Sequence, residues 1–131
     1  MAVFLDSNIV LYAMGADARK HTIAHALLGE WPTVSTQVIN ECSHVLRRKQ
    51  RLSPADVRLR MEALSKVVRL SEVGMNEIRA AWMLAERYGY SHFDSLILAA
   101  DCTTLYSEDM QHHQVVNGRL TIINPFAAET P

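Results

Sequence analysis

The sequence predicts a three-layer α/β/α sandwich with a mostly parallel central sheet. Short apolar segments of β character alternate with helical segments along the chain, which is the pattern of a parallel sheet connected by helices. Two of the apolar segments end at Leu5 and Tyr106, and acidic residues follow both closely. Ligands of such sheets bind beyond the carboxyl ends of the strands. A length of 131 residues fits one domain, 1–131.

The first third of the chain gives a strand and two helices. The apolar run Ala2–Leu5 reads as a buried strand. Asp6–Asn8 then supplies the polar residues that begin a helix, which we expect over Ile9–Met14. Apolar residues at helical spacing predict a second helix within Asp17–Glu30, and Pro32 ends it.

The middle third gives a short strand and two further helices. Val34 is expected in the strand, and Thr36 is expected to cap a helix over Gln37–Gln50. Ser53, followed by proline and then an acid, is a strong helix start. That helix is expected to run to about Lys66.

The last third contains the most apolar helix. Asn76–Tyr88 is helical and closed by Gly89, and Ser91 is expected to cap a helix over His92–Ala100. Asn117 and the glycine after it mark a turn. The remaining strands are expected at Val67–Leu70, Thr103–Tyr106 and Thr121–Ile123.

The composition excludes several classes of protein. Thirteen Lys and Arg against 14 Asp and Glu give a net charge of −1, so the chain as a whole does not attract nucleic acid or anionic membranes. A polyanion would need a local basic patch or a metal ion. The longest apolar runs, such as Ala80–Ala85, are too short to cross a membrane. Cys42 and Cys102 make no disulfide framework, which suits the cytoplasm.

Three acids occupy positions where burial is expected. Asp6 ends a buried strand, Glu41 shares the apolar face of its helix, and Asp94 lies in the most apolar helix. No basic residue is adjacent to them in sequence, and clustered buried carboxylates repel one another. A divalent cation would neutralise them, and Mg²⁺ or Mn²⁺ prefers oxygen ligands. Such an ion activates water and stabilises charge on a phosphoryl group, so a phosphodiester is the expected substrate.

Each acid also has a purely structural interpretation. Asp6 could cap the helix that follows it, and Glu41 could pair with a basic residue from another element. Asp94 could be a first-turn acid favoured by the helix dipole, and Asp109 could be an ordinary loop acid. Asp101, at a helix end where acids are disfavoured, is not expected to belong to the site.

Several other residues allow two interpretations. A basic stretch at the end of the third expected helix could contact RNA phosphates or compensate the helix dipole. The i, i+4 pair His21 and His25 lacks a third metal ligand in the sequence. Trp82 and Met83 fit the core or a dimer interface better than a base-stacking surface. The basic stretch is made of Arg47, Arg48, Lys49 and Arg51.

The order and spacing of four segments resemble PIN domains, and among these the VapC-like toxin ribonucleases. The resemblance covers about residues 2–126. His113 stands where similar relatives commonly have Gly, and Ser95 where Ala is frequent. The four segments are Val3–Asn8, Val38–Glu41, Phe93–Ala100 and Leu105–His112.

The resemblance implies both a site and an activity. The activity would be that of a Mg²⁺- or Mn²⁺-dependent endoribonuclease, a homodimer held inactive by a cognate antitoxin. Asn8 and Ser107 match supporting polar positions, and Glu108 shares the fourth acidic position in some relatives. A PIN-like module that binds RNA or protein without useful catalysis remains the alternative. The metal-site acids implied by the resemblance are Asp6, Glu41, Asp94 and Asp109.

Overall fold

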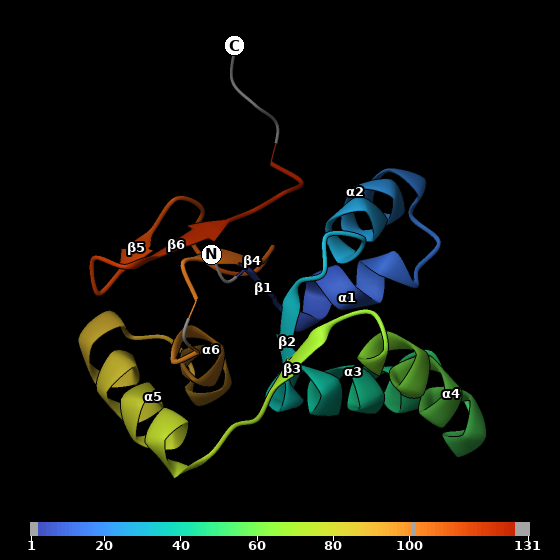
Figure 1. Ribbon diagram of the computed structural model, residues 1–131, viewed down its shortest axis with the longest axis horizontal. Coiled ribbons are helices and arrows are strands. Elements are labelled where there is room, and N and C mark those ends of the chain that lie inside the picture. The colour runs from blue at the N-terminus through green and yellow to red at the C-terminus, as the bar shows by residue number, and fades with distance from the viewer. Residues whose placement is uncertain (1–2, 101, 128–131) are drawn as a thin grey trace.

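The computed structural model describes residues 3–100 and 102–127, and within them strands alternate with helices (Figure 1). Ala2 and Asp101, named above, lie outside the described residues. The strands are β1 (Val3–Leu5), β2 (Thr33–Ser35), β3 (Arg69–Ser71), β4 (Thr104–Tyr106), β5 (Val115–Val116) and β6 (Leu120–Ile123). The helices are α1 (Ser7–Ala13), α2 (Ala18–Leu28), α3 (Thr36–Arg48), α4 (Pro54–Ser65), α5 (Met75–Tyr88) and α6 (His92–Leu98).

The strands form one sheet in the order β3-β2-β1-β4-β6-β5. All neighbours are parallel except the edge strand β5, which runs antiparallel to β6. In the register of β1 and β4, Leu5 is paired with Tyr106, so both strands end at the same level. The predicted mostly parallel sheet is confirmed.

The direction of the chain through the sheet reverses once, and this reversal positions the site. The connections from β1 to β2 and from β2 to β3 carry α1–α4, whereas the return connection to β4 carries α5 and α6. Right-handed crossovers place these two sets of helices on opposite faces, which gives the predicted three layers. Figure 1 shows α5 and α6 together, apart from the group of α1–α4. The reversal falls between β1 and β4, where doubly wound sheets bind ligands.

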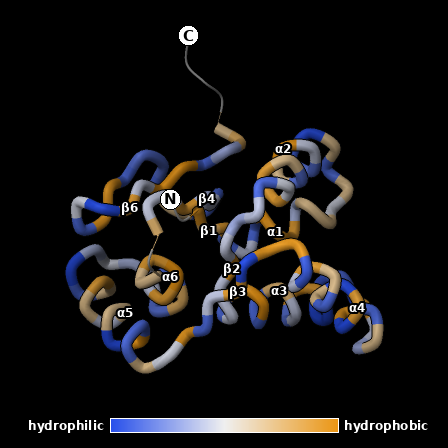
Figure 2. Tube along the Cα trace, viewed as in Figure 1, coloured by the Kyte–Doolittle hydropathy of each residue, from blue (hydrophilic) through white to orange (hydrophobic). Residues whose placement is uncertain are grey.

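The core lies between the sheet and both helix layers. In Figure 2, hydrophobic residues concentrate where helices and strands meet, and hydrophilic residues gather on outer turns such as those at the ends of α2 and α4. No described helix is long and apolar enough to span a membrane. The largest fully buried side chains include Leu5, Ile9, Leu46, Ile97, Leu98, Leu105, Leu120 and Ile122.

Several local predictions need correction. Ser35, not Thr36, caps α3: its hydroxyl accepts from the Val38 N–H at 3.2 Å. Thr36 is the first helical residue, and its hydroxyl accepts from the Val73 N–H instead. Two adjacent hydroxyl residues offer the same capping chemistry, so only the backbone path separates them. The last helix ends at Leu98, and β5 was not predicted.

The exposed apolar residues of α5 exclude one of the two expected places for Trp82 and Met83, the core, and leave the dimer interface as the expectation. Trp82 and Met83 are 55% and 71% exposed, so they are not core residues. They leave a hydrophobic strip on the outer face of α5 together with Met75, which is also exposed.

The backbone at His113 has a conformation that suits glycine, the residue that the resemblance leads us to expect at this position. Its φ is +68°, in the left-handed region that favours residues without a β-carbon. The His113 N–H donates to the Ile122 carbonyl at 2.7 Å, which holds the conformation. Histidine therefore follows a path suited to glycine.

Ser95 gives a test of the packing around α6. Its side chain is fully buried, and its hydroxyl has no hydrogen-bond partner among the described residues. An unsatisfied buried hydroxyl costs free energy, so Ser95→Ala should raise the free energy of unfolding by about 1 kcal/mol more than Ser43→Ala does. Ser43 is the matched control because its hydroxyl donates to the Ile39 carbonyl at 2.8 Å.

Urea unfolding of both variants measures this difference, provided that the slopes against urea stay equal. A Ser95→Ala variant that is less stable than the wild type would contradict the assignment of an unsatisfied hydroxyl.

Candidate metal and active site

Asp6 is the buried centre of the site. It follows β1 directly, caps α1, and is only 3% exposed. Its Oδ1 accepts from the Ser7 N–H at 2.7 Å, and its Oδ2 accepts from the Ser107 hydroxyl at 2.7 Å. The capping role suggested by the sequence is therefore real, but it uses only part of the carboxylate.

Burial governs the protonation of Asp6. Desolvation, helped by the nearby charges of Glu41 and Asp94, raises the pKa of its carboxyl group from 3.8 to about 6. The hydrogen bonds from Ser107 and Ser7 act in the opposite direction and are outweighed. A carboxylate in this position gains most from a positive charge placed beside it.

Glu41 reaches the site from α3. Its Oε2 accepts from the Ser7 hydroxyl at 2.8 Å, and its Oε1 accepts from the Gln37 amide at 3.1 Å. The basic partner that the sequence left open is not found in residues 3–100 and 102–127, where the one ion pair joins Lys20 to Glu108. Neutral donors thus orient Glu41 without cancelling its charge.

Asp94 reaches the site from the first turn of α6. Its N–H donates to the Ser91 hydroxyl at 3.2 Å, so Ser91 caps this turn. Desolvation raises the pKa of Asp94, and the charges of Glu41 and Asp109 contribute in the same direction. These mutual effects show that the acids from four elements lie within electrostatic range of one another.

Asn8 joins the first and last acidic segments. Its amide nitrogen lies 3.1 Å from Asp109 Oδ2 and 3.4 Å from Asp6 Oδ2. Its amide oxygen accepts from the Glu108 N–H at 3.1 Å. The Asp109 N–H in turn donates to the Ser107 hydroxyl at 3.3 Å. Asn8 and Ser107 therefore hold the segment after β4 against Asp6.

Glu108 is occupied on the other side of that segment. Its Oε1 accepts from the Tyr12 hydroxyl at 2.9 Å, and its Oε2 pairs with the Lys20 ammonium at 2.7 Å. Lys20 also lies over the Tyr12 ring, 4.5 Å from its centroid. Of the two adjacent acids, Asp109 is thus the one that contacts Asn8 with its side chain.

The donor set fits a hard divalent cation by its chemistry. All four acids offer carboxylate oxygens, and no ion pair of the described residues neutralises Asp6, Glu41, Asp94 or Asp109. No three His, Cys, Asp or Glu side chains in the described part of the chain stand close enough to enclose an ion as they are.

The histidines do not join this site. His21 and His25 lie next to each other on α2, with ring centroids 5.6 Å apart, and form no metal-binding group with the other described residues. His112 accepts from the Asn124 N–H through Nδ1 at 2.8 Å, which anchors the loop.

Sequence reasoning missed the residues that orient the acids. Gln37 precedes Glu41 by one helical turn, a spacing that could have identified it. Ser7, Tyr12 and Lys20 contact Glu41 or Glu108 across long stretches of chain, for which the sequence carries no local signal.

The fold is that of a known nuclease-type class. The family model of the PIN domain matches residues 3–101, so the chain belongs to the PIN domain family. Nucleases of this family generally use a divalent metal. The resemblance to PIN domains noted in the sequence is confirmed.

Three solved structures share the fold. One is VapC20 of Mycobacterium tuberculosis, a sarcin–ricin loop cleaving toxin, with a TM-score of 0.66 and 22% identity over 82% of this chain and 90% of that chain. A toxin–antitoxin complex from Klebsiella pneumoniae has a TM-score of 0.70 and 18% identity, and the match covers 98% of this chain and 100% of that chain. VapBC2 of Rickettsia felis, bound to a promoter DNA fragment, has a TM-score of 0.66 and 16% identity, and the match covers 93% of this chain and 97% of that chain. No curated protein matches the chain significantly.

The raised pKa of Asp6 predicts an unusual dependence of stability on pH. Between pH 4 and pH 6 the folded chain binds a proton at Asp6 more tightly than the unfolded chain does, so this group lowers stability as pH rises. Asp6→Asn should remove this loss of folding stability, because asparagine does not ionise. It should raise the free energy of unfolding at pH 8 by up to about 3 kcal/mol. The gain should vanish near pH 4.

Denaturation in EDTA from pH 4 to pH 8 measures the effect, with Asp56→Asn on the exposed start of α4 as the control. An Asp6→Asn variant that is destabilised at pH 8 would contradict the assigned burial cost and show that the cap dominates.

Proposed function

We propose that the chain is a metal-dependent endoribonuclease, one PIN-like domain acting as the toxin of a toxin–antitoxin pair. One observation supports the proposal: the carboxyl groups of Asp6, Glu41, Asp94 and Asp109 lie within electrostatic range of one another near the switch point of the sheet, and none has a basic partner among the described residues. Mg²⁺ or Mn²⁺ is the cofactor that this donor set suits.

Four acids are proposed as metal ligands: Asp6, Glu41, Asp94 and Asp109. Ser107 and Asn8 serve as supporting residues, because both donate to Asp6 and both hold the segment that carries Asp109. Glu108 is proposed to stay outside the metal site, since Tyr12 and Lys20 bind both of its oxygens.

The chain prepares this chemistry through fixed dipoles. A bound Mg²⁺ or Mn²⁺ would supply an activated water and stabilise negative charge on the scissile phosphate. The Ser107 hydroxyl and the Ser7 N–H keep both Asp6 oxygens oriented. The Asn8 amide directs Asp109 toward the same point. Holding the ligands in this way reduces the reorganisation needed when substrate arrives.

The biological setting is proposed from the neighbours of the fold. A cleaved RNA is named for VapC20, and two other neighbours are complexes of toxin–antitoxin type. We propose the same partners for this chain: an RNA substrate, a cognate antitoxin and a second copy of itself. Cys42 and Cys102 are both buried and make no disulfide framework, which suits a reducing cytoplasm.

RNA cleavage tests the proposal directly. With Mg²⁺ or Mn²⁺ the wild type should cut RNA, and EDTA should abolish the activity. Asp94→Asn and Asp109→Asn should each reduce the rate at least about 100-fold, because each removes a proposed ligand. Glu108→Gln should reduce it far less, which makes it the matched control for Asp109.

Cleavage that survives EDTA and both Asp→Asn changes would refute the proposal. The alternative, a PIN-like module that binds RNA or protein without useful catalysis, is tested by calorimetric titration with MnCl₂. No binding at millimolar Mn²⁺ would favour that module.

A further inference from the structure

A groove of about 300 Å³ begins beside the acids and is not used by the proposed metal site. Its wall includes Asn8 at one place and Gln50, just beyond α3, at another. The other residues of the wall are Leu11, Tyr12, Gly15, Ala16 and Asp17. We call this the α1 groove.

The α1 groove adjoins the proposed active site at Asn8, a residue that the two share. The amide of Asn8 lies 3.1 Å from Asp109 and 3.4 Å from Asp6, and the same side chain lines the groove. A strand whose phosphate lies at the acids would therefore present a neighbouring nucleotide to the groove.

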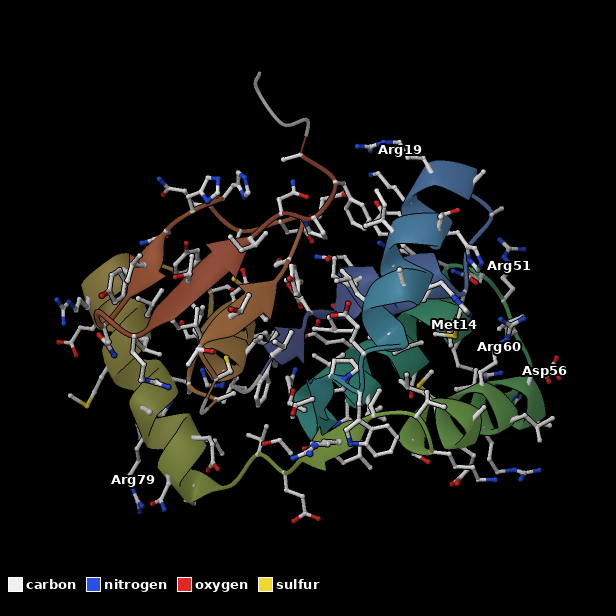
Figure 3. All side chains as sticks on the ribbon, turned by 45° about the horizontal axis from the view of Figure 1, so that its top comes forward. Met14, Arg19, Arg51, Asp56, Arg60 and Arg79 are labelled. Carbon is white, nitrogen blue, oxygen red and sulfur yellow. The ribbon has the colours of Figure 1, made fainter. Side chains whose placement is uncertain are left out.

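The charges around the groove favour a base inside it and phosphates outside it. Asp17 lines the groove, and its negative charge repels a phosphate. A basic stretch surrounds Gln50, and all of its members are exposed: Arg47, Arg48, Lys49 and Arg51. Figure 3 shows Arg51 beside the connection between α1 and α2, where Gly15 and Ala16 line the groove. Phosphates are therefore drawn to this rim and not to the interior.

The polar groups of the groove suit the edge of a base. The Gln50 side chain is exposed and makes no hydrogen bond within the described residues, so its amide can both donate and accept. Asp17 Oδ1 caps α2 by accepting from the Lys20 N–H at 3.0 Å, which leaves Oδ2 available as an acceptor. Unpaired RNA bases are read through such contacts to their edges.

We infer that the α1 groove is a subsite for one unpaired base of single-stranded RNA next to the scissile phosphate, an inference that rests on the proposed nuclease function. The side chains of Gln50 and Asp17 determine which base binds, through hydrogen bonds to its edge. The Asp17 carboxylate can accept from the exocyclic amino group of cytosine, adenine or guanine, whereas uracil has no such group and offers only its N3–H as a donor. The groove therefore favours bases with an exocyclic amino group over uracil at this position.

Binding of single-stranded RNA tests the inference separately from catalysis. The full chain carrying Asp94→Asn, which silences cleavage, is titrated with labelled octanucleotides that differ at one position, including an abasic one. Gln50→Ala should weaken binding of the preferred octanucleotide about 5- to 10-fold and leave the abasic one unaffected. Asp17→Asn, which keeps the helix cap, should remove the discrimination against uracil.

Two arginine substitutions, one in the basic stretch beside the groove and one far from it, test whether that stretch binds RNA phosphates. Arg51→Ala should weaken all octanucleotides equally and reduce the salt dependence by about one counterion. Arg79→Ala, on α5 and far from the groove in Figure 3, should change nothing.

The outcomes separate this inference from the nuclease proposal. If the wild type never cleaves RNA but the Gln50 and Asp17 effects appear, the nuclease proposal fails and the subsite stands. Equal affinities for the abasic and complete octanucleotides, or unchanged affinities in Gln50→Ala and Asp17→Asn, overturn the subsite, as they would if the groove served a protein partner.

Discussion

The burial of the Asp6 carboxylate between β1 and β4 is the constraint on which the rest of the site depends. The parallel register ends both strands at one level, so residues that follow them must share a small space. Burying a carboxylate there is unfavourable, as the pKa of about 6 indicates. The fold tolerates this cost because Asp6 also caps α1 and accepts from Ser107.

Polar contacts around Asp6 determine which of the neighbouring acids lies near it. Asn8 and Ser107 bring Asp109 toward the centre, while Tyr12 and Lys20 hold Glu108 away from it. Two adjacent acids in one loop thus receive different environments. The same Asn8 also opens onto the α1 groove, so one amide lies at the border between the proposed chemistry and the proposed recognition of a base.

The sequence was informative where periodicity dominates and silent where contacts are distant. Apolar spacing located nearly every strand and helix, because burial on a sheet leaves a regular pattern. It placed a cap at Thr36 instead of Ser35, since neighbouring hydroxyls are equivalent until the backbone is known. Lys20 and Glu108 are 88 positions apart, and no local rule connects them. The spacing of apolar residues also could not show that the Ser95 hydroxyl is buried without a hydrogen-bond partner among the described residues.

The central claim is that the clustered acids form one site for a divalent cation. Anomalous diffraction from crystals grown with MnCl₂ tests it most directly. The account predicts a manganese peak at bonding distance, roughly 2.0–2.2 Å, from oxygens of Asp6 and at least one of Glu41, Asp94 and Asp109. A well-ordered site without such a peak, or a peak only at His21 and His25, would contradict it.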